Sequence, residues 1–309
     1  MSIPILIDCD PGHDDAIALL LALASPEVEL LGVTTVSGNQ TLAKTTANAL
    51  RVLELVERGD VPVAAGADRP LVRDLFVAAY AHGESGLEGP ALPPPGGAPV
   101  DAHAIDFLAD RIEASPEPVT LIPIGPLTNV ALLLARYPEL AARLERVVLM
   151  GGAIAEGNVT PAAEFNIWAD PEAAQRVFES GLDVTMIGLD VTHRALLTPA
   201  HAERLRAAGR TGTMVAELVA FFGEFHRATY GWDGSPIHDA VAVAHVLRPG
   251  LVETLPRHVA VETSSELCRG RTVVDLWRRT ENEPNAHVGV EIDAEGFLEL
   301  LVSRINTFP

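Results

Sequence analysis

Four aspartates fall within residues 8–15, near the start of the chain. Asp8 and Asp10 end a short apolar run, and Asp14 and Asp15 open the helical pattern that follows. The helix dipole favours an acidic side chain in a first helical turn by up to about 1 kcal/mol, which would account for one of the four. Packed carboxylates raise one another's pKa unless a cation or a proton offsets their charge. The segment therefore predicts a cation-binding loop at an active site.

The loop favours Ca²⁺ over other cations. Ca²⁺ accepts about six to eight oxygen ligands, whereas Mg²⁺ takes fewer protein ligands in tighter geometry and is the second choice. The loop is not an EF-hand, because a strand pattern precedes it and the twelfth position from Asp8 is Leu19 rather than Glu.

The elements that must position this loop alternate between strand and helix. Apolar runs predict strands over residues 3–8, 29–36, 119–124, 146–150 and 184–189, with helices over 14–24, 41–57, 128–136 and 171–180. From about residue 197 the pattern is mainly helical, with shorter strands near 257–262, 271–276 and 286–291. This alternation predicts an α/β fold with an open, mostly parallel central sheet flanked by helices and a helical C-terminal portion. We expect residues 1–309 to form one domain.

Oxygen-bearing side chains follow nearly every predicted strand. Ligands bind open parallel sheets beyond the carboxyl ends of the strands. The side chains found there are Asn39, Asn129, Asn158, Glu164, Asn166, Asp170, Asp190, Thr192 and His193, and the pair His238-Asp239 precedes an apolar helix. The pattern predicts a polar site that holds a hard cation.

Two segments are predicted as loops near this site. Residues 66–100 are rich in Gly, Pro and Ala, and long loops of this kind often act as lids. Tyr230 and Trp232 fall in a second glycine-containing loop, near 223–235, where they either stack on a ligand or pack.

Composition excludes several classes of function. The formal net charge of −20 disfavours nucleic-acid binding. No stretch of 18 apolar residues is free of charges, and no signal-peptide pattern opens the chain, so we expect neither a membrane span nor export. The two cysteines, Cys9 and Cys268, form no disulfide framework, which fits the cytoplasm.

The loop also partly resembles the Asp-x-Asp strand end of haloacid-dehalogenase-like phosphatases. Those enzymes need a later basic residue, usually lysine, near the phosphate. The only lysine, Lys44, falls inside a predicted helix and lacks that context. A metal-dependent phosphatase of this type remains the alternative enzyme.

Taken in order, the motifs resemble those of the inosine–uridine-preferring nucleoside hydrolases over essentially the whole chain. The matching segments are 8–16, 38–41, 82–86, 125–129, 148–152, 157–158 with 164–166, and 237–239. The first is highly specific, and the ordered set is more so.

This resemblance implies a role for each matching residue. It assigns Ca²⁺ to Asp10, Asp15, Asp239 and the backbone carbonyl of Ile124, a position where the family often has Thr. It assigns the ribose to Asp14, Asn39, Asn158, Glu164, Asn166 and Asp239. It places His82 and His238 against the base, with Phe165 nearby.

The implied reaction is Ca²⁺-dependent hydrolysis of a ribonucleoside to ribose and free base. A bound cation lowers the pKa of a water, Asp10 takes its proton as general base, and a histidine protonates the leaving base. The transition state is oxocarbenium-like, as in glycoside hydrolysis. A catalytically silent nucleoside- or sugar-binding protein is the third possibility, disfavoured because Asp10 and the whole ligand set are intact.

Some features stay open at this stage. His82 is either a lid residue or an ordinary exposed loop histidine, and His238-Asp239 taken alone would only start a helix. His13 receives no role, and Cys9 is expected to pack under the loop. Cys9 and His13 occur in pyrimidine-preferring relatives, which favours uridine and cytidine. The resemblance also implies a homodimer or homotetramer.

Overall fold

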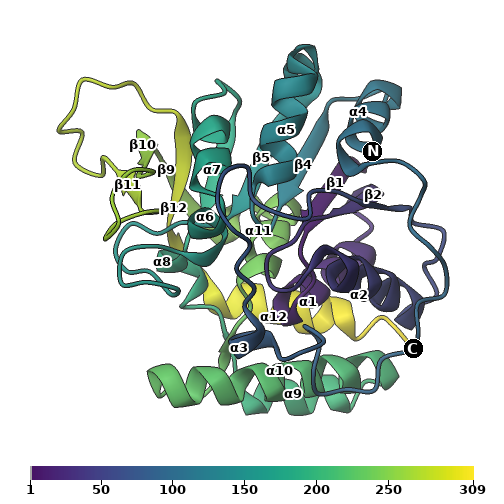
Figure 1. Cartoon of the computed structure of the whole chain (residues 1–309). Helices are drawn as coiled ribbons and strands as arrows, with labels where there is room; N and C mark the ends of the chain where they lie inside the picture. Colours follow the sequence, from purple (N-terminus) through teal and green to yellow (C-terminus); the bar gives the residue numbers. More distant parts are fainter. Residues whose placement is uncertain (1) are drawn as a thin grey trace.

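An eight-stranded sheet forms the centre of the computed structural model, which describes residues 2–309 (Figure 1). The strand order is β3-β2-β1-β4-β5-β6-β12-β9, and all neighbours are parallel except β12 and β9. The strands of this sheet are β1 (Ile3–Cys9), β2 (Val28–Thr35), β3 (Val63–Ala65), β4 (Val119–Pro123), β5 (Leu144–Met150), β6 (Val184–Ile187), β9 (Val252–Arg257) and β12 (Ala286–Ile292). Two small antiparallel pairs lie outside it, β7 (Leu196–Leu197) with β8 (Ser235–Pro236), and β10 (Val259–Val261) with β11 (Thr272–Val274).

Helices cover both faces of the sheet. They are α1 (His13–Leu23), α2 (Leu42–Leu55), α3 (Ala79–His82), α4 (Ala104–Ala114), α5 (Thr128–Arg136), α6 (Phe165–Ala169), α7 (Pro171–Phe178), α8 (Leu189–Thr192), α9 (Pro199–Arg206), α10 (Arg210–Tyr230), α11 (His238–Leu247) and α12 (Ala294–Ile305). Two 3₁₀ helices, η1 (Pro138–Arg143) and η2 (Pro249–Leu251), complete the set.

The alternation of side chains along β1 divides the core into two layers. Ile5 and Ile7 belong to the hydrophobic cluster that α1, α2, α10, α11 and α12 cover. Leu6 belongs to the other cluster, which α4, α5 and α7 cover. Since β1 is buried on both faces, it reads as a continuous apolar run, as the strands of parallel sheets do.

The structure confirms the predicted open, mostly parallel sheet flanked by helices. The nine strands and helices predicted up to residue 189 all form, with ends within about three residues of prediction. Sequence reasoning missed β3, α4 and most of β9. β3 is only three residues long, too short for a period-2 pattern to show.

Two predictions about loops need correction. Segment 66–100 is not wholly irregular, because α3 forms within it. Tyr230 does not lie in a loop: it is the last residue of α10, and Gly231 ends the helix in the left-handed conformation. The apolar spacing of α10 continues to this residue, and glycine at the C′ position is a common stop signal.

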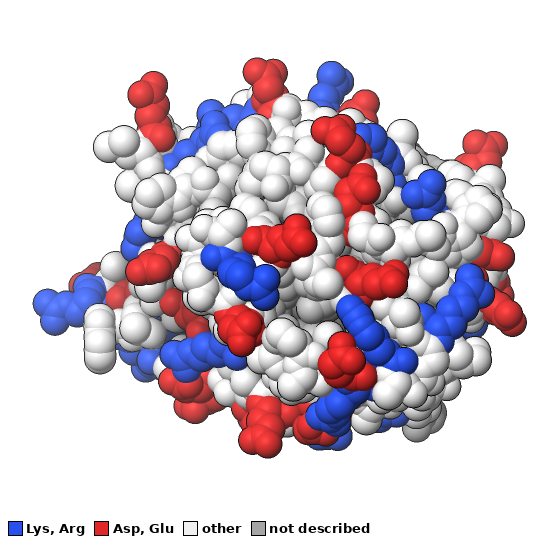
Figure 2. All heavy atoms as spheres, turned by 90° about the horizontal axis from the view of Figure 1, so that it is seen from below, with Lys and Arg blue, Asp and Glu red and all other residues white. Residues whose placement is uncertain are grey.

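Acidic and basic side chains alternate on the face that α9 and α10 form, and the acidic ones separate the basic ones (Figure 2). Such a mixed surface lacks the basic stripe that a phosphate backbone requires. Within residues 2–309, no helix is both long enough and apolar enough to cross a membrane.

Candidate active site

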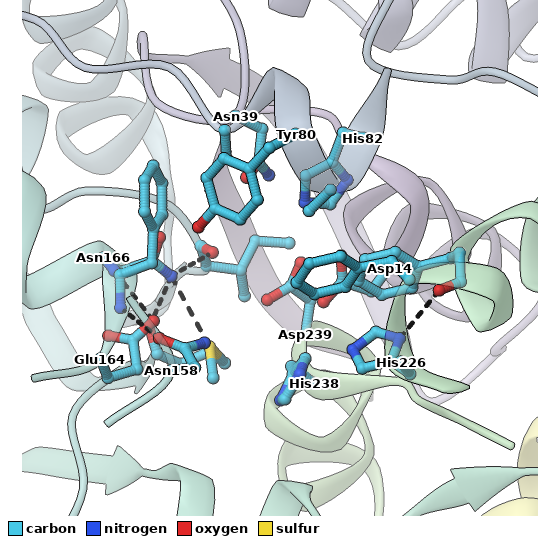
Figure 3. Close-up of a pocket in the computed structure, with 17 residues that line it drawn as sticks. Asp14, Asn39, Tyr80, His82, Asn158, Glu164, Asn166, His226, His238 and Asp239 are labelled. Carbon is cyan, nitrogen blue, oxygen red and sulfur yellow. Dashed lines mark hydrogen bonds between the residues drawn. The ribbon is translucent and has the colours of Figure 1, made fainter. Parts of the chain in front are cut away.

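A polar hollow opens where β1, β2, β4 and β5 end at the same edge of the sheet (Figure 3). It encloses about 560 Å³ of empty space, a figure that includes the open solvent at its mouth. The residues that line it are Asp14, Asn39, Ala78, Tyr80, Ala81, His82, Ile124, Met150, Asn158, Glu164, Phe165, Asn166, Phe222, Phe225, His226, His238 and Asp239. All of the predicted site residues are in this set except Asp10 and Asp15.

Asp15 closes the 8–15 loop by accepting hydrogen bonds from the loop's own backbone. Its two oxygens accept from the N–H of Asp10 (3.1 Å) and of Gly12 (2.9 Å). The side-chain amide of Asn39, which follows β2, donates to Asp15 at 3.0 Å. The loop is therefore held in shape by a carboxylate at the start of α1, and Asn39 ties it to the neighbouring strand.

Asp10 occupies a tight cradle between two glycines. A Cβ atom on Gly38 would lie 2.1 Å from its Oδ2, and one on Gly125 would lie 2.5 Å from its Oδ1. Oδ2 accepts the backbone N–H of Asn39 at 2.6 Å, whereas the buried Oδ1 has no protein partner among the described residues. A buried oxygen without a partner costs free energy unless a proton, water or cation satisfies it.

Asp14, Asp15 and Asp239 bring one carboxylate oxygen each within 4.8 Å of one another, and all three residues are buried. Asp239 opens α11, more than two hundred residues along the chain from the loop. Sequence reasoning assigned Asp10, Asp15, Asp239 and the Ile124 carbonyl to the metal and Asp14 to the ribose. The cluster contains Asp14 with Asp15 and Asp239, and Asp10 is not part of it. Buried carboxylate oxygens of this kind fit a hard divalent cation.

The pKa values of these carboxyls are raised, because burial without a cation disfavours their charged forms. Burial, together with the charge of Asp15, raises the pKa of Asp14 to about 8. Burial also holds the pKa of Asp10 and Asp239 well above the usual value, and neighbouring aspartates add to the shift. Such a cluster is stable when ionised only if a positive charge joins it.

A second carboxylate wall comes from the turn before α6. Glu164 caps this short helix, since its oxygens accept from the N–H of Asn166 (2.8 Å) and of Ile167 (3.1 Å). Burial raises the pKa of Glu164 to about 7. Asn158 accepts from the N–H of Phe165 at 2.9 Å, which fixes the turn. These contacts place Asn158, Glu164 and Asn166 on one side of the hollow (Figure 3).

Asn166 connects this wall to the cation position. Its side-chain amide donates to the backbone oxygen of Ile124 at 2.9 Å and to that of Met150 at 3.2 Å. The Ile124 oxygen is the carbonyl that sequence reasoning assigned to the metal. One carbonyl oxygen has two lone pairs, so it can accept from Asn166 and still face a cation.

His82 lies on the opposite side of the hollow and is buried, so the exposed-loop interpretation is wrong. Its Nδ1 lies 3.1 Å from Nδ1 of His13, and the other ring nitrogen of His13 lies 2.9 Å from the backbone oxygen of Glu88. Burial lowers the pKa of His13 to about 4 and that of His82 well below its usual value. Both rings are therefore neutral at neutral pH.

His238 stands beside Asp239 at the start of α11, and its Nδ1 lies 2.7 Å from the hydroxyl of Thr192. Burial lowers the pKa of His238 well below its usual value. His226 lines the hollow next to it and donates from Nδ1 to the Phe222 carbonyl, with the two atoms 2.9 Å apart. Burial lowers the pKa of His226 to about 4.

Tyr230 and Trp232 pack together rather than lining the hollow. Their rings stack at 4.5 Å between centroids, and Trp232 stacks on His226 at 6.0 Å. Trp232 also meets His193 edge-on. The sequence left open whether Tyr230 and Trp232 stack on a ligand or pack. In the structure they pack, and both rings stack on His226.

Sequence reasoning did not assign five large side chains that line the hollow, namely Tyr80, Met150, Phe222, Phe225 and His226. Phe222, Phe225 and His226 are spaced on α10 so that three and four residues separate them, which places them on one helical face. The apolar residues on that face of α10 have the spacing typical of a helix packed in the core, so the sequence pattern alone does not predict a site there.

The remaining polar residues of the first loop have structural roles. Cys9 is buried, as expected. Asp8 accepts hydrogen bonds from Thr34 and Asn129, and burial raises its pKa to about 7.

Lys44 contacts Gln40 and Glu84 instead of the hollow. Within the described chain no lysine or arginine lines the hollow, so the basic residue that a phosphatase needs is missing.

Comparisons with known proteins agree with this geometry. The family profile described as inosine-uridine preferring nucleoside hydrolase matches residues 5–299. A pyrimidine-specific ribonucleoside hydrolase RihA of Salmonella arizonae is 52% identical over 310 residues, covering 100% of both chains, and one of Citrobacter koseri is 53% identical, covering 99% of this chain and 98% of the relative. Among solved structures, a purine-preferring ribonucleoside hydrolase from Gardnerella vaginalis is 35% identical and superimposes with a TM-score of 0.93, covering 98% of both chains.

Proposed function

The chain belongs to the inosine-uridine preferring nucleoside hydrolase family and is a ribonucleoside hydrolase, and from this premise we propose that it splits uridine and cytidine into ribose and free base with Ca²⁺ bound. The observation that carries the proposal is the buried Oδ1 of Asp10, which has no protein partner in the described chain and stands beside a cluster of carboxylates. An unpaired, buried carboxylate oxygen at the edge of a polar hollow is what a general base for water requires.

The residues present fit a hard divalent cation. Asp10, Asp15, Asp239 and the Ile124 carbonyl would hold it, and Asp14 lies with Asp15 and Asp239. Bound there, Ca²⁺ would supply orientation of the ribose diol and a lowered pKa of water. Asp10, as the ionised carboxylate, would take the proton of the attacking water.

The same hollow holds the sugar. The residues that bind the ribose hydroxyls are Asp14, Asn39, Asn158, Glu164, Asn166 and Asp239. As the N-glycosidic bond breaks, positive charge develops on the ring. The carboxylates of Asp14, Glu164 and Asp239 stabilise that charge.

The histidine side of the hollow receives the leaving base. His82 and His238 face it with Phe165 nearby, and His238 is the group that we assign to proton donation. When the Thr192 hydroxyl accepts from Nδ1 of protonated His238, Nε2 carries the other ring proton, and its transfer to the base leaves the ring neutral. The contact with Thr192 occupies Nδ1, so Nε2 is the nitrogen left to face the base.

The relatives support a pyrimidine preference. The relatives at 52% and 53% identity bear the name pyrimidine-specific ribonucleoside hydrolase, while the purine-preferring one is 35% identical. We further propose that the protein acts in the cytoplasm on free nucleosides as a homodimer or homotetramer, without nucleic-acid or membrane partners. The mixed surface charge supports the absence of a nucleic-acid partner.

One assay tests the proposal. The protein is incubated with uridine, cytidine and inosine, with added Ca²⁺ or with EDTA, and reducing sugar is measured. We expect ribose from uridine and cytidine at a higher kcat/KM than from inosine, and loss of activity in EDTA. An aryl phosphate ester serves as the control substrate. Phosphate release from it, or no ribose from any nucleoside, would overturn the proposal.

A further inference from the structure

His13 lies inside the cation loop, where neither the metal nor the ribose accounts for it. Its ring is completely buried and stacks on Phe221 and Phe222, at 5.2 Å and 5.3 Å between centroids and with interplanar angles of 7° and 3°. The aromatic rings of α10 therefore fix the plane of the imidazole. A side chain held this firmly can impose an orientation on its neighbour.

We propose that His13 is a positioning residue that fixes the tautomer of His82, so that His82 offers the substrate a hydrogen-bond acceptor at Nε2 instead of a proton. The acceptor suits an N–H or O–H group of the nucleoside. The inference rests on the proposed function in one respect only, namely that a nucleoside occupies the hollow that His82 lines.

The first step of the argument concerns His13 itself. Its Nε2 lies 2.9 Å from the backbone oxygen of Glu88, and a carbonyl oxygen can only accept. Nε2 of His13 therefore carries a proton. No carboxylate is hydrogen-bonded to the ring within the described chain, and burial against the rings of Phe221 and Phe222 disfavours a charge on it. The ring is neutral, and its Nδ1 is an acceptor.

The second step passes from His13 to His82. The two Nδ1 atoms lie 3.1 Å apart, and since that of His13 accepts, that of His82 must donate. A neutral imidazole carries one proton, so Nε2 of His82 is unprotonated. Nδ1 is held by His13, which leaves Nε2 as the nitrogen available to a ligand.

Nδ1 of His82 has a second contact with His13, through the backbone. The backbone N–H of His13 also points at Nδ1 of His82, at 3.3 Å, and it would favour the opposite tautomer. The ring contact favours the proposed tautomer, because a proton on Nε2 of His82 would leave the lone pairs of the two Nδ1 atoms facing each other at 3.1 Å. Without that ring nitrogen, the backbone N–H is the only partner of Nδ1, and the proton moves to Nε2.

The surroundings keep both histidines in place. A Cβ atom on Gly12 would lie 2.5 Å from Nδ1 of His82, so the ring rests directly against the turn of the cation loop. The side-chain amide of Asn48 donates to the backbone oxygens of Pro11 (3.0 Å) and Ser85 (2.9 Å). The side chain of Asn48 thus links the backbone of the cation loop to the backbone of the segment that carries His82.

The test compares three substitutions of His13 in the Ca²⁺-loaded protein. His13→Asn keeps an oxygen acceptor near the position of Nδ1, whereas His13→Gln reaches Glu88 but offers no acceptor at that position. His13→Phe keeps the stacking and has neither group. The ¹⁵N NMR signals of His82, assigned by their loss in a His82→Gln variant, report which ring nitrogen bears the proton.

We expect a protonated Nδ1 in the native protein and in His13→Asn, and a protonated Nε2 in His13→Gln and His13→Phe. Loss of one substrate hydrogen bond should raise KM about fivefold in these last two, with kcat within about twofold. His13→Asn should restore the native KM. Thermal unfolding of each variant separates local from global effects.

Three results would overturn the inference. These are a protonated Nε2 of His82 in the native protein, equal effects of His13→Asn and His13→Gln, or a fall in kcat at unchanged KM. If the native protein hydrolyses no nucleoside, the proposed function fails. The NMR signals still decide the tautomer in that case, so the two failures are distinguishable.

Discussion

Cation binding should release protons, because the buried carboxyls hold them when no cation is present. Burial raises the pKa of Asp14 to about 8, so this group alone retains about 0.9 of a proton at pH 7. Ca²⁺ must displace it. At pH 7 we expect about one or more protons released per cation bound, and an affinity that rises about tenfold per pH unit for each proton.

The same protons set the stability of the cation-free protein. The pKa of Asp14 is 3.8 when exposed and about 8 when folded, so the folded state binds more protons across that window. Its contribution is fully present below pH 3.8 and is lost as pH rises toward 8. The slope is about 1.4 kcal/mol per pH unit, or on the order of 5 kcal/mol across the window for this group.

Two measurements check this prediction. Isothermal titration calorimetry with Ca²⁺ in two buffers of different ionisation enthalpy counts the protons released. Chemical unfolding at a series of pH values, in EDTA and in saturating Ca²⁺, gives both stability profiles. Asp14→Asn is the matched variant, and it should lower the proton count by about one at pH 7.

The reasoning would be refuted by a titration that releases no protons at pH 7. It would also be refuted if EDTA and Ca²⁺ gave parallel stability profiles between pH 5 and 8. Either result would mean that the carboxyls are already ionised without the cation, so that another group compensates their charge.

Three further perturbations test other parts of the structure. Asp10→Asn should lower kcat by at least about a hundredfold in the ribose assay while the protein stays folded; a loss below about tenfold would remove Asp10 as the base. Burial lowers the pKa of His245 from 6.5 to about 4, so the native protein loses about 3 kcal/mol as pH falls through that range, and His245→Leu should flatten this acid limb in unfolding experiments run with Ca²⁺ present. Gly12→Ala places a Cβ atom against His82 and should raise KM, whereas the control Gly59→Ala, with open space around it, should not; equal kinetics of both variants would contradict the close approach.

The half of the site proposed to bind metal and sugar was predictable because the sheet fixes it. Parallel strands bring their carboxyl ends to one edge, so side chains that follow β1, β2, β4 and β5 lie near one another. Asn39 and Asn166 come from different crossovers, yet both follow strands that end at this edge. Asp239 stood out in the sequence only as part of a pair before an apolar helix, and the metal role assigned to it came from the family resemblance.

The wall on the base side was not predictable in this way. Tyr80, Phe222 and His226 reach the hollow because α10 packs against α1 and α3 packs against α10, and no strand end places them. Phe222 and His226 have the spacing on α10 that core residues have. The apolar pattern of a helix therefore does not separate the residues that line a site from those that pack in the core. The role of His13 was hidden for a related reason, since its partner His82 lies 69 residues away.

The side chains at the strand ends and those on α3 and α10 are held in place by different interactions. The cation loop and the Glu164 turn are held by hydrogen bonds from backbone N–H groups. The base-side wall depends on side-chain packing along α10, where a change of residue alters the shape and polarity of the hollow. His226, whose pKa burial lowers to about 4, is neutral at physiological pH and donates from Nδ1 to the Phe222 carbonyl, which leaves its Nε2 as an acceptor. With the tautomer proposed for His82, this wall presents two ring-nitrogen acceptors to N–H groups of the base, one from α3 and one from α10.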